Sequence, residues 1–251
     1  ALAIEDTQFY RATLQAERMA AMGQTIANLS HHVKNILQGV RGGSYLIETG
    51  LNKKDFDVAR KGWRIVERNQ ERISNLVMDM LSFSKERVPE LREGDVRHTV
   101  NEVVELMQTC AEEVHAKLLW DPPTHFPPVR FDPDALHRAV LNVVTNAIDA
   151  VESRENGEVR LSLTIDPKTQ LVELAIEDNG EGIAPENLER IFSVFESKKG
   201  ARGTGLGLPV SRKILREHGG DVLVASQPGQ GTRFTLRWPG VTEGVDRPTM
   251  I

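Results

Sequence analysis

Two asparagines four residues apart, Asn142 and Asn146, lie in a segment with helical spacing, so their amides share one helix face. An amide oxygen can bind Mg²⁺ directly or through water, which makes this face a candidate metal site. Solvated or capping asparagines are the alternative, but asparagine is not favoured in the middle of a helix. The same segment reaches Asp149, which we include among the candidate ligand-binding residues.

The pattern D-x-G-x-G follows directly after a predicted strand and contains Asp178, Gly180 and Gly182. Glycines at the end of a strand let the main chain approach a ligand closely. The carboxylate of Asp178 can accept a hydrogen bond from an adenine amino group, and Ile183 borders the pattern. A plain turn explains the pattern about as well, so it indicates a nucleotide site only in company with other motifs.

A glycine-rich loop leads into another predicted helix and contributes Gly203, Thr204, Gly205, Leu206, Gly207 and Leu208. The N–H groups of such a loop, together with the positive end of the helix, suit a phosphate group. Lys198 lies just before the loop and could neutralise phosphate charge. The loop does not follow a βαβ strand with a later ribose-binding acid, which disfavours a dinucleotide fold.

A histidine near the N-terminus, His31, projects away from the apolar stripe of a predicted long helix. Asn35 lies one turn later on the same exposed face, with His32 and Lys34 on the two flanks. A neutral, accessible imidazole has a free lone pair near pH 7 and can act as a nucleophile in phosphotransfer. An ordinary solvated histidine is the alternative for His31 taken alone.

The elements that must carry these residues begin with two long helices, predicted over residues 5–49 and about 55–87. The first has an apolar stripe at Met22, Ile26, Leu29, Val33, Ile36, Val40 and Ile47. The second has a heptad seam at Phe56, Ala59, Trp63, Val66, Gln70, Ile73, Val77, Met80 and Ser84. Two narrow seams cannot close a core, so we expect a homodimeric four-helix bundle over residues 20–88. A plain dimerisation coiled coil would explain the seams equally well.

A second domain is predicted over residues 95–240, after Pro89 ends the second helix and residues 90–95 form a polar linker. Helices are expected at 96–116, 133–152 and 207–218, and strands at 118–120, 129–131, 159–165, 171–177, 222–225 and 232–237. Asp132 is a plausible N-cap, with Pro133 at the first helical position. The whole is therefore an α+β chain: a helical hairpin, then an α/β two-layer sandwich, then a tail over 241–251.

Composition narrows the partners of this 251-residue chain. The formal net charge is −5 without a long basic run, so nucleic acid and anionic membranes are poor partners. Cys110 is the only cysteine, and no apolar stretch approaches the about 18–20 residues that span a bilayer. These features fit a cytoplasmic protein without membrane contact. The chain opens within a helical pattern, and we expect residues 1–19 to be a signal-input helix.

Together with the aromatic segment that contains Ile191, Phe192 and Phe195, these segments resemble the H, N, G1, F and G2 boxes of bacterial sensor histidine kinases. Their ATP-binding domain belongs to a superfamily shared with gyrase-type, Hsp90-type and MutL-type ATPases. The segment 229–232 resembles the GxGT of that superfamily and adds Thr232 to the candidate site. The resemblance implies ATP and Mg²⁺ as cofactors, with Asn146 as the metal-binding residue and Asp178 at the adenine. It also implies a mobile lid over residues 198–204, phosphorylation of His31, and a response-regulator receiver domain as the partner that receives the phosphoryl group.

Two positions depart from the H-box pattern, and a third separates the chain from the ATPase relatives. His32 replaces an acidic residue of the H-box, and as a neutral base it could still accept the proton of the imidazole. Ile36 replaces a common proline and keeps the helix straight. Asn142 stands where the ATPase relatives carry a water-activating Glu, so His31 is the expected nucleophile. A catalytically degenerate nucleotide-binding scaffold and an ATP-hydrolysing clamp are the alternatives.

Overall fold

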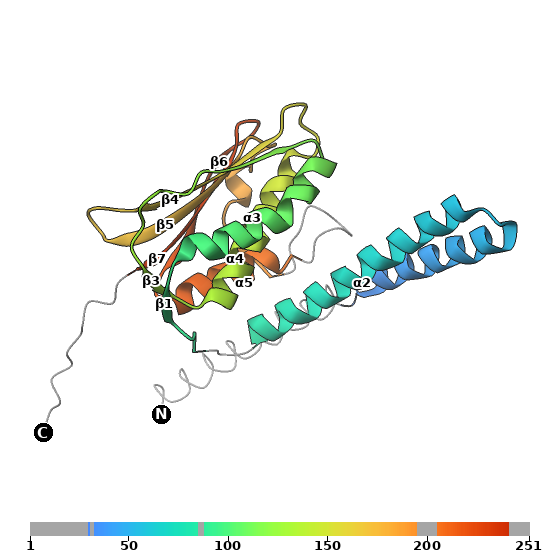
Figure 1. Ribbon diagram of the computed structural model, residues 1–251, viewed down its shortest axis with the longest axis horizontal. Helices are drawn as coiled ribbons and strands as arrows, with labels where there is room; N and C mark the ends of the chain where they lie inside the picture. The colour runs from blue at the N-terminus through green and yellow to red at the C-terminus, as the bar shows by residue number, and fades with distance from the viewer. Residues whose placement is uncertain (1–29, 31–32, 85–87, 195–204, 241–251) are drawn as a thin grey trace, which may run out of the picture. The chain divides into compact units, whose positions relative to one another are not determined.

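The computed structural model describes residues 30, 33–84, 88–194 and 205–240 (Figure 1). The chain divides into two compact units, one containing the helical hairpin and the other the α/β domain. The segments 1–19 and 241–251 lie outside the described residues. Within the described part of the chain, no helix combines the length and apolar character that a bilayer span requires.

The hairpin consists of a helix over residues 33–53 and α2 (Phe56–Ser84). The turn between them is only two residues, Lys54 and Asp55, and Lys54 has a positive φ of 55°. The first helix was predicted to end at residue 49, and this is wrong because Gly50 is helical and the helix continues to residue 53. A Cβ on Gly50 would lie 2.5 Å from the amide nitrogen of Ala59, so glycine is required there for close packing rather than for a turn.

The two helices of the hairpin meet through small residues. The buried positions recur every seven residues on both helices: Ile36, Gly43 and Gly50 on the first, and Gly62, Asn69 and Leu76 on α2. A Cβ on Gly62 would lie 2.6 Å from the carbonyl oxygen of Gly43, and a Cβ on Gly39 would lie 2.6 Å from the Asn69 amide. The main chains therefore touch almost directly, and any side chain at these glycines would force them apart.

The predicted heptad seam of α2 divides between two faces of the helix. Ala59 and Val66 are half-buried and lie against Gly50 and Gly43 of the first helix. The larger seam residues stay exposed in the single chain, namely Phe56, Trp63, Ile73, Val77 and Met80. Within the described hairpin, the small seam residues therefore contact the first helix. The large ones, which we call the bulky row, have no partner helix there.

The α/β domain contains a five-stranded sheet in the order β2-β4-β5-β7-β6. The strands are β2 (Lys117–Trp120), β4 (Glu158–Ile165), β5 (Leu171–Asp178), β6 (Asp221–Gln227) and β7 (Gly231–Pro239). Only β2 and β4 pair in parallel. The helices α3 (Val96–Glu113), α4 (Pro133–Val151) and α5 (Gly207–Glu217) cover one face of the sheet (Figure 1). The predicted two-layer sandwich is confirmed.

The core lies between this sheet and the three helices. Inward residues alternate with outward ones, as in β4, where Val159, Leu161 and Leu163 are buried. The other face of the sheet carries charged pairs such as Glu177 and Arg233, which stay in contact with water. This alternation is what made the strands predictable from sequence.

Residues 90–95, predicted as a polar linker, belong to the α/β domain. They contain β1 (Arg92–Gly94), which pairs antiparallel with β3 (Val129–Phe131). The linker prediction is therefore wrong for this segment, because a three-residue strand has too few positions to show a period.

Asp132 joins this segment to two helices. One carboxylate oxygen caps α4 by accepting from the Ala135 amide at 3.1 Å, as predicted, and the other accepts from the Glu90 amide at 3.0 Å. The Asp132 amide in turn donates to Nε2 of His218, at 2.9 Å. Nδ1 of that buried ring lies 2.8 Å from the Ile214 carbonyl oxygen, which assigns the proton to Nδ1. Asp132 thus fastens residue 90 to the start of α4 and the end of α5.

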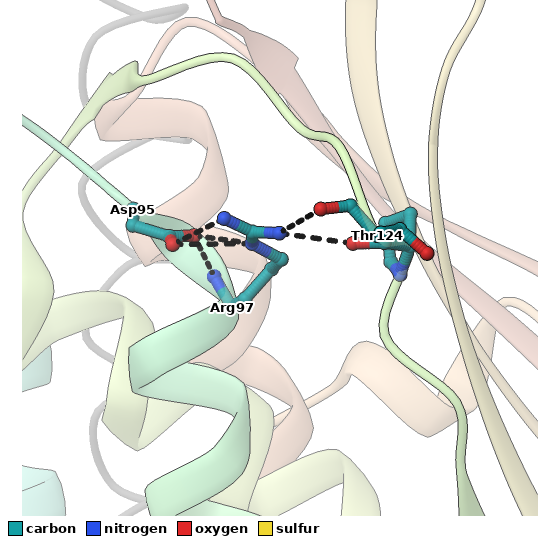
Figure 2. A network of polar contacts seen from close by, with 4 residues as sticks. Asp95, Arg97 and Thr124 are labelled. Atoms are coloured by element: carbon teal, nitrogen blue, oxygen red, sulfur yellow. Dashed lines mark hydrogen bonds and ion pairs between the residues drawn. The ribbon is translucent and has the colours of Figure 1, made fainter.

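A second polar network fixes the start of α3 (Figure 2). Asp95 is the N-cap of α3, and the Arg97 guanidinium binds both of its carboxylate oxygens. These hydrogen bonds from Arg97 hold the pKa of Asp95 below its ordinary value of 3.8. The same guanidinium donates to the carbonyl oxygens of Pro123 and Thr124, both at 3.0 Å. Arg97 therefore ties the proline-rich loop 121–128 to the helix start.

Candidate functional site

One face of α4 links two of the predicted motifs. Asn142, Asn146 and Ala150 recur at four-residue intervals and so line up along the helix. The Asn142 amide donates to the carbonyl oxygen of Gly207, the first residue of α5, at 3.2 Å. At the other end, Gly180 packs so tightly on the Ala150 carbonyl that no Cβ would fit. Asn146, half-buried, lies between these contacts on a row that spans about 12 Å.

Asp178 ends β5 as a buried carboxylate that is 8% exposed. Its Oδ1 accepts from the Gly180 amide at 2.9 Å, which fixes the side chain at the head of the D-x-G-x-G loop. Thr232 is its partner in the register on β7 and is also buried. Gly231 has a φ of 95° and leaves no room for a Cβ against the Asp178 carbonyl. The structure therefore brings Asp178, Gly180 and Thr232 together.

Gly182 and Ile183 complete this loop. Gly182 has a φ of 70° and packs on the carbonyl of Gln227 so closely that only glycine fits. The Ile183 amide donates to Oγ of Ser226 at 2.8 Å. The glycine pattern is thus required both by backbone conformation and by close packing.

The start of α5 carries the described part of the predicted phosphate loop. Gly205 has a φ of 65°, Leu206 is buried, and Leu208 is half-buried in the first turn of the helix. The carbonyl of Gly207 is held by Asn142 and by Oγ of Ser211, 2.9 Å away. The helix start is thereby fixed against α4. Lys198, Gly203 and Thr204 lie outside the described residues, and their roles stay predictions.

The region of the predicted phosphoacceptor is described only in part, because His31 and His32 lie outside the described residues. Lys34 is exposed, as its flanking position predicts, whereas Asn35 is half-buried. The neighbouring Ile36 is buried, so Asn35 lies at the border of the buried face rather than fully on the open face.

The site matches what a nucleotide with Mg²⁺ would need. Among the described residues, no three His, Cys, Asp or Glu side chains form a group that could hold a metal. Mg²⁺ keeps waters and substrate oxygens rather than an all-protein cage, so amide oxygens from Asn142 and Asn146 fit it. Asp149 is exposed in the last turn of α4, at the same end as the Gly180 contact.

Three supporting side chains of the site were not predicted. Oδ1 of Asn179 accepts from the Glu158 amide, and its Nδ2 donates to the Asn156 carbonyl, both at 2.8 Å. Arg154 and Ser226 contact the same loop from two other directions. Their partners are mostly main-chain atoms, which leave no mark in a sequence, and only the position of Asn179 inside the D-x-G-x-G pattern could have drawn attention to it.

Comparisons with known proteins agree with this geometry. Residues 131–242 match the family described as histidine kinase-, DNA gyrase B- and HSP90-like ATPase. The signal transduction histidine-protein kinase AtoS of Escherichia coli strain K12 is 31% identical over 229 residues, covering 91% of this chain and 36% of AtoS. The chain therefore spans about a third of that relative's length.

The solved structures that resemble the chain include ShkA and MprB. Full-length ShkA in complex with AMPPNP is 27% identical with a TM-score of 0.63, covering 88% of this chain and 46% of ShkA. The mycobacterial sensor histidine kinase MprB is 30% identical with a TM-score of 0.50, covering 61% of this chain and 98% of that structure.

The sheet, its three covering helices and the Asn142–Asp178–Gly207 site define a domain of the histidine kinase-, gyrase B- and HSP90-like ATPase class. The helical hairpin that precedes this domain extends the similarity over most of the chain. Together these similarities support a histidine kinase core.

Proposed function

We propose that the chain is the core of an ATP-dependent protein-histidine kinase, which phosphorylates itself on His31. The observation that carries this proposal is the row on α4, where the Asn142 amide contacts the start of α5 and Ala150 contacts the Asp178 loop. A nucleotide laid along this row would have its base at Asp178 and its phosphates at the N-terminus of α5.

The residues of the chain have separate tasks in this mechanism. Asp178 accepts from the adenine amino group, and the N–H groups at the start of α5 bind phosphate oxygens. Asn146 and Asn142 would hold Mg²⁺, which supplies charge neutralisation at the phosphates. A lone-pair nitrogen of His31 attacks the γ-phosphorus, the bond to the bridging oxygen breaks, and ADP leaves. The proton on the other nitrogen of His31 passes to His32 or to water.

The amide at position 142 favours transfer to histidine over hydrolysis. A carboxylate there would be placed to take a proton from water, whereas an amide is not a base at neutral pH. The Asn142 Nδ2 is moreover engaged with Gly207. An ATP-hydrolysing clamp is therefore disfavoured.

The bulky row of α2 supports a homodimer. Phe56, Trp63 and Val77 recur at multiples of seven and are 68%, 56% and 49% exposed in the single chain. Pairing with the same row of a second copy would close a four-helix bundle. We also propose that residues 1–19 pass on the signal and that a response-regulator aspartate receives the phosphoryl group. We place the reaction in the cytoplasm, where ATP is available.

The test is incubation of the chain with Mg²⁺ and γ-labelled ATP. We expect acid-labile label on the wild type and none on His31→Gln, with ADP binding equal in both. Label that persists on His31→Gln would refute the acceptor assignment. Steady phosphate release independent of His31 would favour the clamp, and nucleotide binding without any label would favour the scaffold.

Two variants refine the chemistry. We expect His32→Ala to slow labelling if His32 accepts the proton, and an unchanged rate would refute that role. Asn35 is proposed to orient water for the reverse phosphatase reaction, so Asn35→Ala should lose dephosphorylation of the receiver domain while keeping autophosphorylation.

A further inference from the structure

The loop 178–183 is held in place along most of its length by atoms outside it. The Glu181 carbonyl accepts from the Gly229 amide at 2.7 Å, and Asn179 binds the turn before β4. Two further contacts, from Arg154 and Ser226, engage the loop on either side of its second glycine, Gly182. Loops this rich in glycine have much conformational freedom to lose, so such external contacts decide how well the loop is ordered before a ligand arrives.

Arg154 contacts two loops at once. It lies just beyond α4, where its amide donates to the Val151 carbonyl at 2.8 Å. Its Nη2 donates to the carbonyl of Gly180 at 2.8 Å and to that of Gly229 at 2.9 Å. One guanidinium therefore joins the Asp178 loop to the turn between β6 and β7.

Ser226 connects the other end of the loop to the sheet. Its Oγ accepts from the Ile183 amide at 2.8 Å and lies 2.8 Å from the Gly231 carbonyl and 3.0 Å from Oγ1 of Thr232. Ser226 is opposite Thr232 in the register, and Thr232 is opposite Asp178. The hydroxyl thus sets the distance from the loop end to the strand that neighbours Asp178.

We infer that Arg154 and Ser226 are positioning residues for base recognition, an inference that rests on the proposed nucleotide site. They hold the loop so that the Asp178 carboxylate meets an adenine amino group at fixed geometry. Guanine has a carbonyl at that position, which would face the carboxylate as a second acceptor. A loosened loop can move away from the guanine carbonyl and so relieve this repulsion. Losing either side chain therefore lowers the preference for adenine over guanine more than it lowers phosphate binding.

The expected effects follow from the loss of one or two hydrogen bonds. ADP affinity should fall about 3- to 10-fold in Arg154→Ala and in Ser226→Ala. The ratio of GDP to ADP dissociation constants should fall in both. The rate of His31 phosphorylation at saturating ATP should stay within about twofold, because neither side chain touches the phosphate end of the site.

The experiment uses the full chain and measures ADP and GDP binding by calorimetry, with KM and kcat for His31 labelling. Arg154→Lys and Ser226→Thr keep a donor or a hydroxyl and should recover part of the ADP preference. Matched controls are Arg92→Ala, which removes an exposed guanidinium paired only with Glu90 in the described structure, and Ser162→Ala, on an exposed position of β4.

The outcomes separate this inference from the proposed function. A wild type that binds neither nucleotide refutes both. A wild type that prefers ADP, with unchanged preference in Arg154→Ala and Ser226→Ala, refutes the positioning role alone. A fall in melting temperature without a change in the ADP to GDP ratio also refutes it, because a purely structural role would do that. Should Ser226→Ala fail to fold, the exposed Arg154 and the Ser226→Thr variant still decide the question.

Discussion

The hairpin and the α/β domain bury their surfaces in opposite ways. The α/β domain has a continuous core of Val, Leu and Ile side chains from all five strands of the sheet and from three helices. In the described part of the hairpin, only Ile36 and Leu76 are fully buried apolar side chains, and glycines make the closest contacts. The large side chains of α2 remain outside, as Trp63 does.

This difference indicates a division of tasks. The α/β domain completes its own core and presents a site whose described residues are already held in place by hydrogen bonds. The hairpin has little apolar burial of its own, so the proposed homodimer would stabilise it by covering the Phe56–Trp63–Val77 row. Nucleotide binding should therefore survive changes that abolish phosphorylation.

The most damaging test of this division places charge on the exposed row. We expect the double variant Trp63→Glu and Val77→Glu to lose roughly 6 kcal/mol or more of dimer association free energy. The loss is this large because the proposed dimer would bury four of these apolar side chains, two from each copy. His31 labelling should disappear while ADP affinity stays the same, as measured by light scattering, labelled ATP and calorimetry. Leu106→Glu, on an exposed site of α3, is the control. Persistence of the dimer in the double variant would contradict the comparison.

A second test concerns the glycine contact inside the hairpin. A Cβ on Gly62 would lie 2.6 Å from the Gly43 carbonyl oxygen, so Gly62→Ala should cost about 1–3 kcal/mol of hairpin stability. Gly42→Ala is the matched control, since a Cβ there meets nothing within 4 Å and alanine should stabilise the helix by up to about 1 kcal/mol. Thermal unfolding followed by circular dichroism measures both. Equal effects of the two alanines would show that the helices are not in main-chain contact.

A third test concerns where the α/β domain begins. The Leu91 amide donates to the Pro89 carbonyl, a turn whose central residue has a φ that proline can adopt. Glu90→Pro should therefore fit while removing the amide that donates to Asp132, and destabilise the domain by about 1–2 kcal/mol. Glu90→Ala keeps the amide and is the control. Denaturant unfolding measures both variants. Equal unfolding midpoints would show that the hydrogen bond from the Glu90 amide to Asp132 does not stabilise the domain.

The smallest expected effect is a pH dependence at the α5–β6 junction. Burial alone would raise the pKa of Asp221, but hydrogen bonds from Arg212, the Val222 amide and Arg216 together lower it below 3.8. Because the folded-state pKa is the lower one, this stabilisation is present above pH 3.8 and is lost as the pH falls through the folded value. The free energy of unfolding, measured from pH 6 to pH 3, should fall less steeply in Asp221→Asn than in the wild type. The difference between the two should stay under about 1 kcal/mol.

Most of the α/β domain could be predicted because its signals are local. Alternation reveals β4 and β5, and Asp132 with Pro133 marks the start of α4. The strand β1 could not be predicted, because its only signature is a partner on β3, some 35 residues away by the chain's numbering. Local pattern therefore fails where a short segment owes its structure to a distant one.

The hairpin shows a different limit. Its heptads were read from apolar residues, yet the helices meet through Gly43, Gly50 and Gly62. A glycine in a sequence indicates flexibility or a turn as readily as close packing, and the predicted first helix accordingly stopped just before Gly50. In the candidate site, Asp178 and Asn142 could be singled out from the sequence because their side chains suit a ligand. Arg154 and Ser226 hold main-chain atoms and have no such signature.

The pairing of β1 with β3 has a practical consequence for anyone who isolates the α/β domain. A fragment starting at Asp95 would leave the edge of β3 bare and Asp132 without the Glu90 amide. Such an uncovered edge invites strands of neighbouring molecules and therefore precipitation at crystallisation concentrations. A fragment that starts a residue or two before Glu90 keeps both contacts and is the better choice for screening nucleotide-competitive compounds.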